Sequence, residues 1–317
     1  MDGLDDLATR LLVDLLRDHS DPRKSLGQHY LVDDQVIDRT MDIPGEFSEQ
    51  TSKDSHILEV GPGPGSLTLA LLRTNAKVTA IEIDEESVAH LERVFGNRAT
   101  SLLIQEADAV KENWPAGITH VISNLPYQIS SPIIERITRY NSSDGMKLAI
   151  ILVQEEFAHR MAMSSPPHDI GPLGLNLWLD FDVFLDRKVP PSSFSPSPRV
   201  NSRLVVMKPV NREEASGINK RLFRMVTKHC FSNRRRKLRN LLSKNPSRIS
   251  RIPGWHKDRW QKTLSRVIES EIDGLEEGWP DLRPEMLEPP QWASLVRAIS
   301  SKSVSYTHLT LPTNREV

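Results

Sequence analysis

The segment Asn124-Leu125-Pro126-Tyr127 combines the residue types that a methyl-acceptor site for adenine requires. The lone pair of the exocyclic amine of adenine is delocalised into the ring, so hydrogen-bond acceptors must draw the amine toward tetrahedral geometry. Asn124 offers a side-chain oxygen and Leu125 a backbone carbonyl, while Pro126 bends the chain without adding an amide donor. Tyr127 is expected to stack on the base, a contact worth about 1 to 3 kcal/mol in nucleic-acid complexes. The segment therefore predicts methyl transfer to an amine by positioning and electrostatics, without a strong general base.

A glycine-rich turn precedes this segment in the chain. The turn, residues 61–65, follows the apolar run 57–60 and leads into the helical run 67–72, which predicts the strand, turn and helix of a nucleotide-binding unit. Pro62 and Pro64 remove two backbone donors that a pyrophosphate would need at this place. The turn therefore suits an uncharged ribose and thioether better than the phosphates of a dinucleotide.

Two acidic residues follow the next two predicted strands. Glu82 lies 21 residues after Gly61, where a carboxylate can accept hydrogen bonds from both ribose hydroxyls of a nucleotide. Asp108 follows the third predicted strand, where its carboxylate can accept from an adenine amino group. The carboxyl ends of parallel strands meet at one sheet edge, where such folds bind ligands. The turn and the two acids together predict one S-adenosylmethionine site.

Short apolar runs that alternate with helical ones predict an α/β fold, a Rossmann-like domain with a mainly parallel sheet. The strands expected in the parallel part are residues 56–60, 77–83, 101–107, 120–125 and 147–154. Two later runs, 181–189 and 203–208, are joined by a proline-rich stretch and have no helix between them. We expect them to form an antiparallel pair at one edge of the sheet.

The two ends of the chain have different patterns. Residues 1–22 carry leucines at helical spacing and predict an N-terminal amphipathic helix that ends near Asp21, ahead of a methyltransferase domain at residues 23–209. Apolar residues at helical spacing after Pro209 predict a small helical domain at residues 210–303 that binds RNA. Residues 304–317 are polar and rich in threonine, and we expect a tail that is disordered or foreign to the native protein.

Charge is segregated along the chain although its formal net value is only −1. Residues 220–251 contain twelve lysines and arginines and no acid, whereas residues 256–290 are rich in acids. Aliphatic residues recur at helical spacing in the basic stretch, so we expect its cations to form one helix face that binds phosphates. The residues expected to contact RNA are Arg23, Lys24, Arg234, Arg235, Arg236 and Lys237.

The composition narrows the class of protein further. Cys230 is the single cysteine, which excludes an internal disulfide and a cysteine-rich zinc site, and no metal site is expected. No apolar run reaches eighteen residues, so no membrane span is expected. We expect a cytoplasmic monomer.

The motifs, taken in order, resemble the ribosomal RNA small-subunit adenine N6,N6-dimethyltransferases of the KsgA type, whose relatives include the ribosomal methyltransferases that confer macrolide resistance. The resemblance spans about residues 23–300, and His29 is more similar to archaeal members than to bacterial ones. The motifs that carry it are residues 26–31, 61–65, 82–84, 108–109, 124–127, 153–156, 194–202 and 231–237.

The resemblance implies roles for residues around the cofactor. Gln28, His29 and Leu31 would close over its methionine end, while Gly61 and Gly63 would approach it through their backbone. Glu82 would bind the ribose and Asp108 the cofactor adenine, with Asn124 facing both the cofactor and the target. Phe194 would cover the face of the target base opposite Tyr127.

The family transfers two methyl groups to each of two adjacent adenosines near the 3′ end of small-subunit ribosomal RNA during ribosome biogenesis. The resemblance thus implies an immature small subunit as the partner. The residues alone leave two alternative functions open. One is a DNA adenine methyltransferase, which the segment 124–127 could also serve, and the other is an RNA-binding assembly factor whose methyl transfer is secondary.

Overall fold

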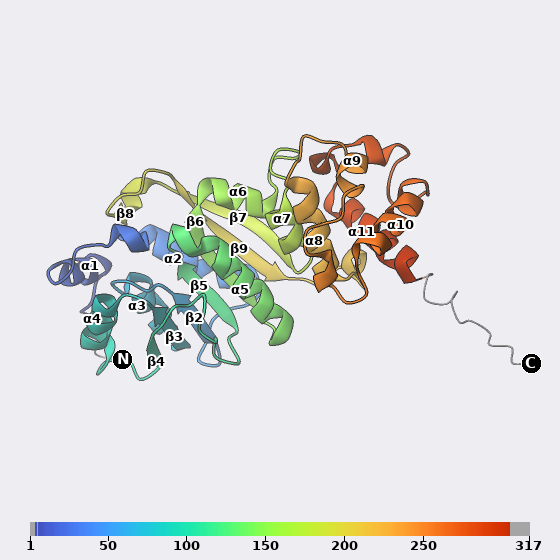
Figure 1. Ribbon diagram of the computed structural model, residues 1–317. Helices are drawn as coiled ribbons and strands as arrows, with labels where there is room; N and C mark the ends of the chain where they lie inside the picture. The colour runs from blue at the N-terminus through green and yellow to red at the C-terminus, as the bar shows by residue number, and fades with distance from the viewer. Residues whose placement is uncertain (1–3, 5, 305–317) are drawn as a thin grey trace, which may run out of the picture. The chain divides into compact units, whose positions relative to one another are not determined.

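The computed structural model describes Leu4 and residues 6–304 of the chain (Figure 1). The tail predicted at the carboxyl end lies, except for Val304, outside the described residues. The described residues up to His159 together with Phe181–Pro209 form unit 1, and Arg160–Asp180 together with the described residues from Val210 onward form unit 2. Residues 160–180, which the sequence analysis places in the first domain, thus group with the second unit.

Unit 1 is built on a seven-stranded sheet, which is mainly parallel with an antiparallel edge and confirms the predicted fold class. In spatial order the strands are β4 (Leu102–Glu106), β3 (Lys77–Glu82), β2 (His56–Val60), β5 (His120–Asn124), β6 (Leu148–Gln154), β9 (Ser202–Pro209) and β7 (Phe181–Val189). The strands β2 and β5 are buried along almost their whole length because helices cover both faces of a parallel sheet.

The strand order places the candidate functional residues at one edge. In the sheet, β2 lies between β3 and β5. After β2 the chain forms β3 and β4 on one side of it, and then forms β5 on the other side. Glu82 pairs in register with Glu106 on β4, and Asn124 pairs with Leu152 on β6, each at the carboxyl end of its strand. The carboxyl ends of β2, β3 and β5 therefore meet where α/β sheets bind ligands.

Helices surround this sheet in unit 1, and Figure 1 shows them beside the strands. They are α1 (Thr9–Arg17), α2 (Asp34–Glu46), α3 (Ser66–Leu72), α4 (Glu85–Phe95), α5 (Ser130–Ser143) and α6 (Glu155–Ala162), with short 3₁₀ turns η1 (Lys24–Leu26), η2 (Tyr127–Ile129) and η3 (Pro191–Ser193). The last three residues of α6 belong to unit 2. The N-terminal helix begins and ends within the range expected from the leucines, but Leu11 and Leu15 are exposed, because the buried face of α1 is formed by Leu12, Val13 and Leu16.

A two-stranded sheet that the sequence analysis did not predict joins distant parts of unit 1. The strands β1 (Tyr30–Leu31) and β8 (Phe194–Ser195) pair antiparallel, with Tyr30 opposite Ser195 and Leu31 opposite Phe194. Each strand has two residues, too few for a periodic pattern to reveal it. The pairing fastens the segment before α2 to the proline-rich loop before β9.

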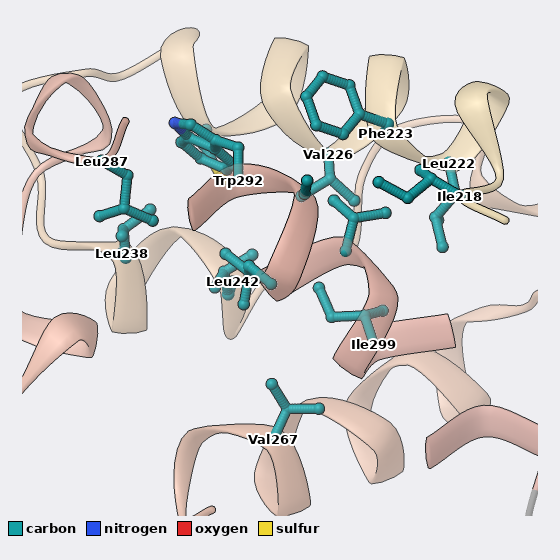
Figure 2. Packing of buried hydrophobic residues seen from close by; sticks show 14 of the residues in the cluster. Ile218, Leu222, Phe223, Val226, Leu238, Leu242, Val267, Leu287, Trp292 and Ile299 are labelled. Carbon is teal, nitrogen blue, oxygen red and sulfur yellow. The ribbon is translucent and has the colours of Figure 1, made fainter. Parts of the chain in front are cut away.

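Unit 2 is helical. Its elements are α7 (Pro172–Trp178), η4 (Glu213–Ala215), α8 (Lys220–Phe231), α9 (Leu238–Leu242), η5 (Ile249–Arg251), α10 (Lys257–Ile268), η6 (Trp279–Asp281), η7 (Pro284–Met286) and α11 (Pro289–Val304). Figure 2 shows side chains of α8, α9, α10 and α11 converging on one core, including Phe223, Leu242, Val267 and Trp292. None of the helices in the described part of the chain is long and apolar enough to cross a membrane.

The basic stretch does not form the face of one helix, contrary to the expectation. Helix α8 ends at Phe231, the chain then turns, and α9 begins at Leu238. The backbone N–H of Leu238, at the start of α9, donates to the carbonyl oxygen of Leu282 over 2.9 Å, a long-range contact. Arg234, Arg235 and Arg236 therefore lie in an exposed turn.

Candidate active site

A cavity of ≈ 340 Å³ lies in unit 1 at the carboxyl ends of the central strands. Its volume falls within the range of small-molecule sites in proteins. Its walls come from segments of residues 25–31, 59–67, 81–83, 107–110 and 124–129. The predicted residues that line it are Gln28, His29, Leu31, Gly61, Gly63, Glu82, Asp108, Asn124, Leu125, Pro126 and Tyr127.

The glycine turn brings the backbone close to two other walls of the cavity. Gly61 and Gly63 have φ values of +68° and +54°, which favour glycine. A Cβ on Gly61 would lie 3.2 Å from the ring of Pro126, and one on Gly63 would lie 3.1 Å from the ring of Tyr30. Side chains at either place would fill the space in which a ligand could meet the turn.

Glu82 presents a buried carboxylate at the end of β3, with 5% of the residue exposed. Its Oε1 accepts from the backbone N–H of Ile83 at 2.8 Å and of Asp84 at 3.0 Å, and its Oε2 accepts from the N–H of Gly63 at 3.0 Å. Burial raises the pKa of this carboxyl, and the three backbone donors oppose that shift. A carboxylate has about four acceptor positions. One position on Oε2 is therefore left for a ligand hydroxyl.

Asp108 is more open than Glu82, with 29% of its side chain exposed. Its Oδ1 accepts from the N–H of Val110 at 3.0 Å, and its Oδ2 lies 2.9 Å from Nζ of Lys111. The hydrogen bond with Lys111 is the main cause that lowers the pKa of the Asp108 carboxyl. An exposed ion pair of this kind contributes about 0 to 1 kcal/mol. Oδ2 can therefore exchange the lysine for a ligand amino group at little cost.

Asn124 ends β5 with its side-chain amide held in one orientation. Its Nδ2 donates to the backbone carbonyl of His29 over 3.1 Å, which leaves Oδ1 available as an acceptor in a residue that lines the cavity. The backbone N–H of Leu125 donates to the carbonyl of Leu152 at 3.2 Å, so the chain stays tied to β6. The carbonyl of Pro126 accepts from the N–H of Ile129 and starts the turn η2.

Tyr127 is anchored at both its ring and its hydroxyl. The hydroxyl lies 2.6 Å from Oγ of Ser202, the buried first residue of β9. The ring centroid lies 5.5 Å from that of His29, at an interplanar angle of 33°. Burial raises the pKa of the Tyr127 hydroxyl. The sequence analysis assigned no role to Ser202, which ends the motif 194–202 and whose contact with Tyr127 is long-range.

Phe194 is not among the residues that line the cavity. It is 3% exposed and belongs to the same apolar core as Leu31 and Val189. The pairing of β8 with β1 places the ring there. The expected stacking of Phe194 on a target base stays a prediction, and it would require the ring to leave this core, at a cost of about 1.5 to 3 kcal/mol of burial.

The segment over the glycine turn is held by Gln28 and His29. Oε1 of Gln28 accepts from the N–H of Arg23 at 2.6 Å and from the hydroxyl of Tyr30 at 3.1 Å, and its Nε2 donates to Asp84 at 3.2 Å. Nδ1 of His29 lies 2.7 Å from the carbonyl oxygen of Pro196. Both polar atoms of the Gln28 side chain thus form hydrogen bonds within the protein.

Two polar residues of the cavity wall were not singled out from the sequence. Glu59 is 2% exposed on β2, accepts from Oγ1 of Thr68 at 2.6 Å, and burial raises the pKa of its carboxyl to about 8. Ser66 is buried, and its Oγ has no hydrogen-bond partner within the described part of the chain. Glu59 lies within an otherwise largely apolar strand, and the presence of an acid there is the only signal in the sequence that could have indicated it. An unpartnered buried hydroxyl in the wall fits a site that binds a polar ligand.

Several cations expected to contact RNA have acidic partners. Nη1 of Arg23 lies 2.9 Å from Oδ1 of Asp84, within unit 1. In unit 2, Nζ of Lys237 lies 3.7 Å from Oδ1 of Asp281, which also pairs with Arg239. Arg234, Arg235 and Arg236 are exposed, and no ion pair is found for them among the described residues. Lys24 belongs to the turn η1.

Comparison with known proteins gives consistent matches. The sequence model of the family described as ribosomal RNA adenine dimethylase matches residues 19–252. The chain is 32% identical over 280 residues to a probable ribosomal RNA small subunit methyltransferase A of Methanopyrus kandleri, covering 88% of this chain and 93% of that protein. It is 34% identical over 270 residues to the protein of the same description from Haloarcula marismortui, covering 84% and 86%.

Two solved structures show the same fold. A dimethyladenosine transferase from Plasmodium falciparum has a TM-score of 0.70 at 24% identity and covers 86% of this chain and 98% of its own. The 23S rRNA methyltransferase ErmE has a TM-score of 0.62 at 20% identity and covers 85% and 99%. These neighbours support the methyltransferase fold expected from the motifs.

Proposed function

The chain belongs to the ribosomal RNA adenine dimethylase family, and on that premise we propose that it methylates N6 of two adjacent adenosines near the 3′ end of small-subunit ribosomal RNA. The product would be N6,N6-dimethyladenosine. The observation that carries the proposal is the amide of Asn124, whose Nδ2 is held by His29 and which lines the same cavity as the glycine turn and Glu82.

The family uses S-adenosylmethionine as its cofactor, and the residues of the cavity fit that molecule. Bound there, S-adenosylmethionine supplies a methyl group on a sulfonium sulfur. Oε2 of Glu82 would accept from a ribose hydroxyl, and Oδ2 of Asp108 from the adenine amino group. The backbone of Gly61 and Gly63 would contact the nucleoside, since a Cβ at either position would occupy that space.

The catalytic segment would act on the target amine through acceptors and an aromatic face. Oδ1 of Asn124 and the backbone carbonyl of Leu125 would accept from the two N–H groups of adenine N6 and localise its lone pair. Tyr127 would stack on the base after the base has left its own stack. Attack on a sulfonium makes the amine acidic, so its proton can pass to water without a strong base in the protein. These residues would contribute by positioning and electrostatics.

The proposed substrate is the RNA of an immature small ribosomal subunit in the cytoplasm, bound by a monomer. The exposed Arg234, Arg235 and Arg236 of unit 2 support binding to phosphates, because an unpaired guanidinium can release counterions from RNA. Unit 1 would then hold the chemistry, and the helical unit 2 much of the RNA affinity.

One experiment tests this proposal against its rivals. Labelled S-adenosylmethionine is offered with unmethylated small subunits, naked small-subunit RNA or DNA, using the wild type, Asn124→Ala and the control Asn97→Ala, an exposed residue outside the cavity. We expect label in the small subunits, lost in Asn124→Ala and kept in Asn97→Ala. Label in DNA alone, or label unaffected by Asn124→Ala, would contradict the proposal.

A further inference from the structure

Asp84 occupies the N-cap position of α4 without capping the helix through its side chain. Aspartate at this position ordinarily accepts from a backbone N–H of the first turn, which stabilises a protein by about 0.5 to 2 kcal/mol. No such hydrogen bond is formed here. The residue is 2% exposed, and its buried carboxylate makes other contacts instead.

Those contacts reach a segment more than fifty residues earlier in the chain. Oδ1 of Asp84 lies 2.9 Å from Nη1 of Arg23, and Oδ2 accepts from Nε2 of Gln28 at 3.2 Å. Oδ2 also accepts from Oγ of Ser87 at 2.8 Å, inside α4. One carboxylate therefore contacts the covering segment, residues 23–30, at its first residue and again at Gln28 near its end.

The covering segment is tied at its other end to the cofactor turn. Oε1 of Gln28, whose amide is held by Asp84, accepts from the hydroxyl of Tyr30, whose ring lies against Gly63. The backbone N–H of Asp84 donates to Oε1 of Glu82 at 3.0 Å. Asp84 thus bonds through its backbone to the proposed ribose acceptor and through its side chain to the segment above it.

We propose that Asp84 is a positioning residue that fastens the covering segment to the turn carrying Glu82, and that this fastening sets how tightly S-adenosylmethionine is held. The inference rests on the proposed function of the cavity. This positioning role is distinct from stabilising α4, because Asp84 bonds through its side chain to Arg23 and Gln28 of the covering segment. A buried carboxylate with a guanidinium and an amide partner is also costly to leave half-paired, which makes the closed arrangement cooperative.

The test compares Asp84→Asn with Glu86→Gln, which makes the same change of charge at an exposed residue in the first turn of α4. Amide hydrogen exchange of residues 25–31 is measured without cofactor, and the dissociation constant of S-adenosylmethionine is measured by calorimetry. Loss of the ion pair with Arg23 and of the charge-assisted hydrogen bonds to the carboxylate predicts about tenfold faster exchange and about tenfold weaker binding in Asp84→Asn. Glu86→Gln should behave as the wild type.

Arg23→Ala provides a second variant that cannot unfold a core, since the Arg23 side chain is 48% exposed. It should weaken cofactor binding, and its effect should not add to that of Asp84→Asn, because both break the same contact. Unchanged exchange in both variants, or faster exchange with unchanged affinity, would overturn the inference. A wild type that binds no S-adenosylmethionine would instead refute the proposed function of the cavity.

Discussion

The side-chain Nδ2 of Asn124 donates a hydrogen bond to the backbone carbonyl of His29, a residue 95 positions earlier in the chain. An amide has a donor end and an acceptor end, so this contact decides which end faces the cavity. The covering segment therefore does more than close the site. It orients the one side-chain acceptor on which the proposed methyl transfer depends.

Asn124→Asp tests this orientation. Aspartate keeps the size of the side chain and an acceptor, but it has no donor for His29 and places a negative charge near that carbonyl. We expect kcat for methyl transfer to fall by about 10²-fold, comparable with the loss of one oriented group in other active sites. Steady-state kinetics on small subunits would measure it, with Asn97→Asp as the control. Retention of most activity in Asn124→Asp would show that the amide donor is dispensable.

Tyr127 allows its ring and its hydroxyl to be tested separately. Tyr127→Phe removes only the hydrogen bond to Ser202, and we expect activity to fall no more than about tenfold. Tyr127→Ala removes the stacking face, and its loss should be at least ten times larger. Ser202→Ala should match Tyr127→Phe. Equal effects of Tyr127→Phe and Tyr127→Ala on the rate of methyl transfer would argue against stacking.

Glu82→Gln is expected to weaken binding of S-adenosylmethionine by about 10- to 100-fold. The substitution replaces a charged acceptor, which is worth about 1.5 to 3 kcal/mol in a hydrogen bond. It also places the side-chain NH₂ of glutamine, a donor, opposite a backbone N–H, which is a donor too. Glu106→Gln is a matched control, because Glu106 is the exposed register partner of Glu82 on β4. Calorimetry with each variant measures the effect. Equal affinities in the two variants would rule out Glu82 as a cofactor ligand.

Glu59 gives the stability of the cofactor-free protein a pH dependence. Burial raises the pKa of its carboxyl from 4.5 to about 8, so the folded state holds a proton that the unfolded state releases. This contribution is full below pH 4.5 and is lost as pH rises toward 8, by up to about 1.4 kcal/mol per pH unit.

The variant Glu59→Gln stays neutral and can still accept from Thr68. Its free energy of unfolding, followed by denaturant titration at several pH values, should therefore rise relative to that of the wild type between pH 5 and pH 8. Glu106→Gln serves as the control and should follow the wild type. Parallel curves for Glu59→Gln and the wild type would mean that Glu59 does not titrate in this window.

The exposed arginines of the turn between α8 and α9 should set the salt dependence of RNA binding. Each phosphate contact adds about 0.7 to 0.9 to the slope of log affinity against log salt. Replacing Arg234, Arg235 and Arg236 by alanine should flatten the slope by about 2, measured by filter binding across salt concentrations. Arg239→Ala is the control, since Arg239 already pairs with Asp281. An unchanged slope in the triple variant would place the RNA elsewhere.

Local patterns predicted much of unit 1 because each depends on neighbours in the chain. The apolar run before Gly61 and the run before Asn124 are strands because continuous burial in a parallel sheet requires such runs. The positions of Glu82 and Asp108 at strand ends followed from the alternation of strands and helices. The antiparallel edge could be inferred from the missing helix between two strands.

Contacts between residues far apart in the chain could not be predicted from the sequence. The contacts of Tyr127 with Ser202 and of Asp84 with Gln28 join residues that no local periodicity relates. The pairing of β8 with β1, which holds Phe194 beside Leu31, could not be read from the sequence either. After the break between α8 and α9, Leu238 bonds to Leu282, far along the chain.

The sequence by itself therefore determined which residue types lie at the candidate site: Asn124 at a strand end, a glycine turn without two donors, and carboxylates at or just after the ends of two successive strands. Residue type and spacing suffice for these because they are properties of single strands and turns. Only the tertiary structure decided which way each group points. The amide of Asn124 and the carboxylate of Asp84 both bond to the covering segment, and such contacts exist only once the sheet has brought distant residues together.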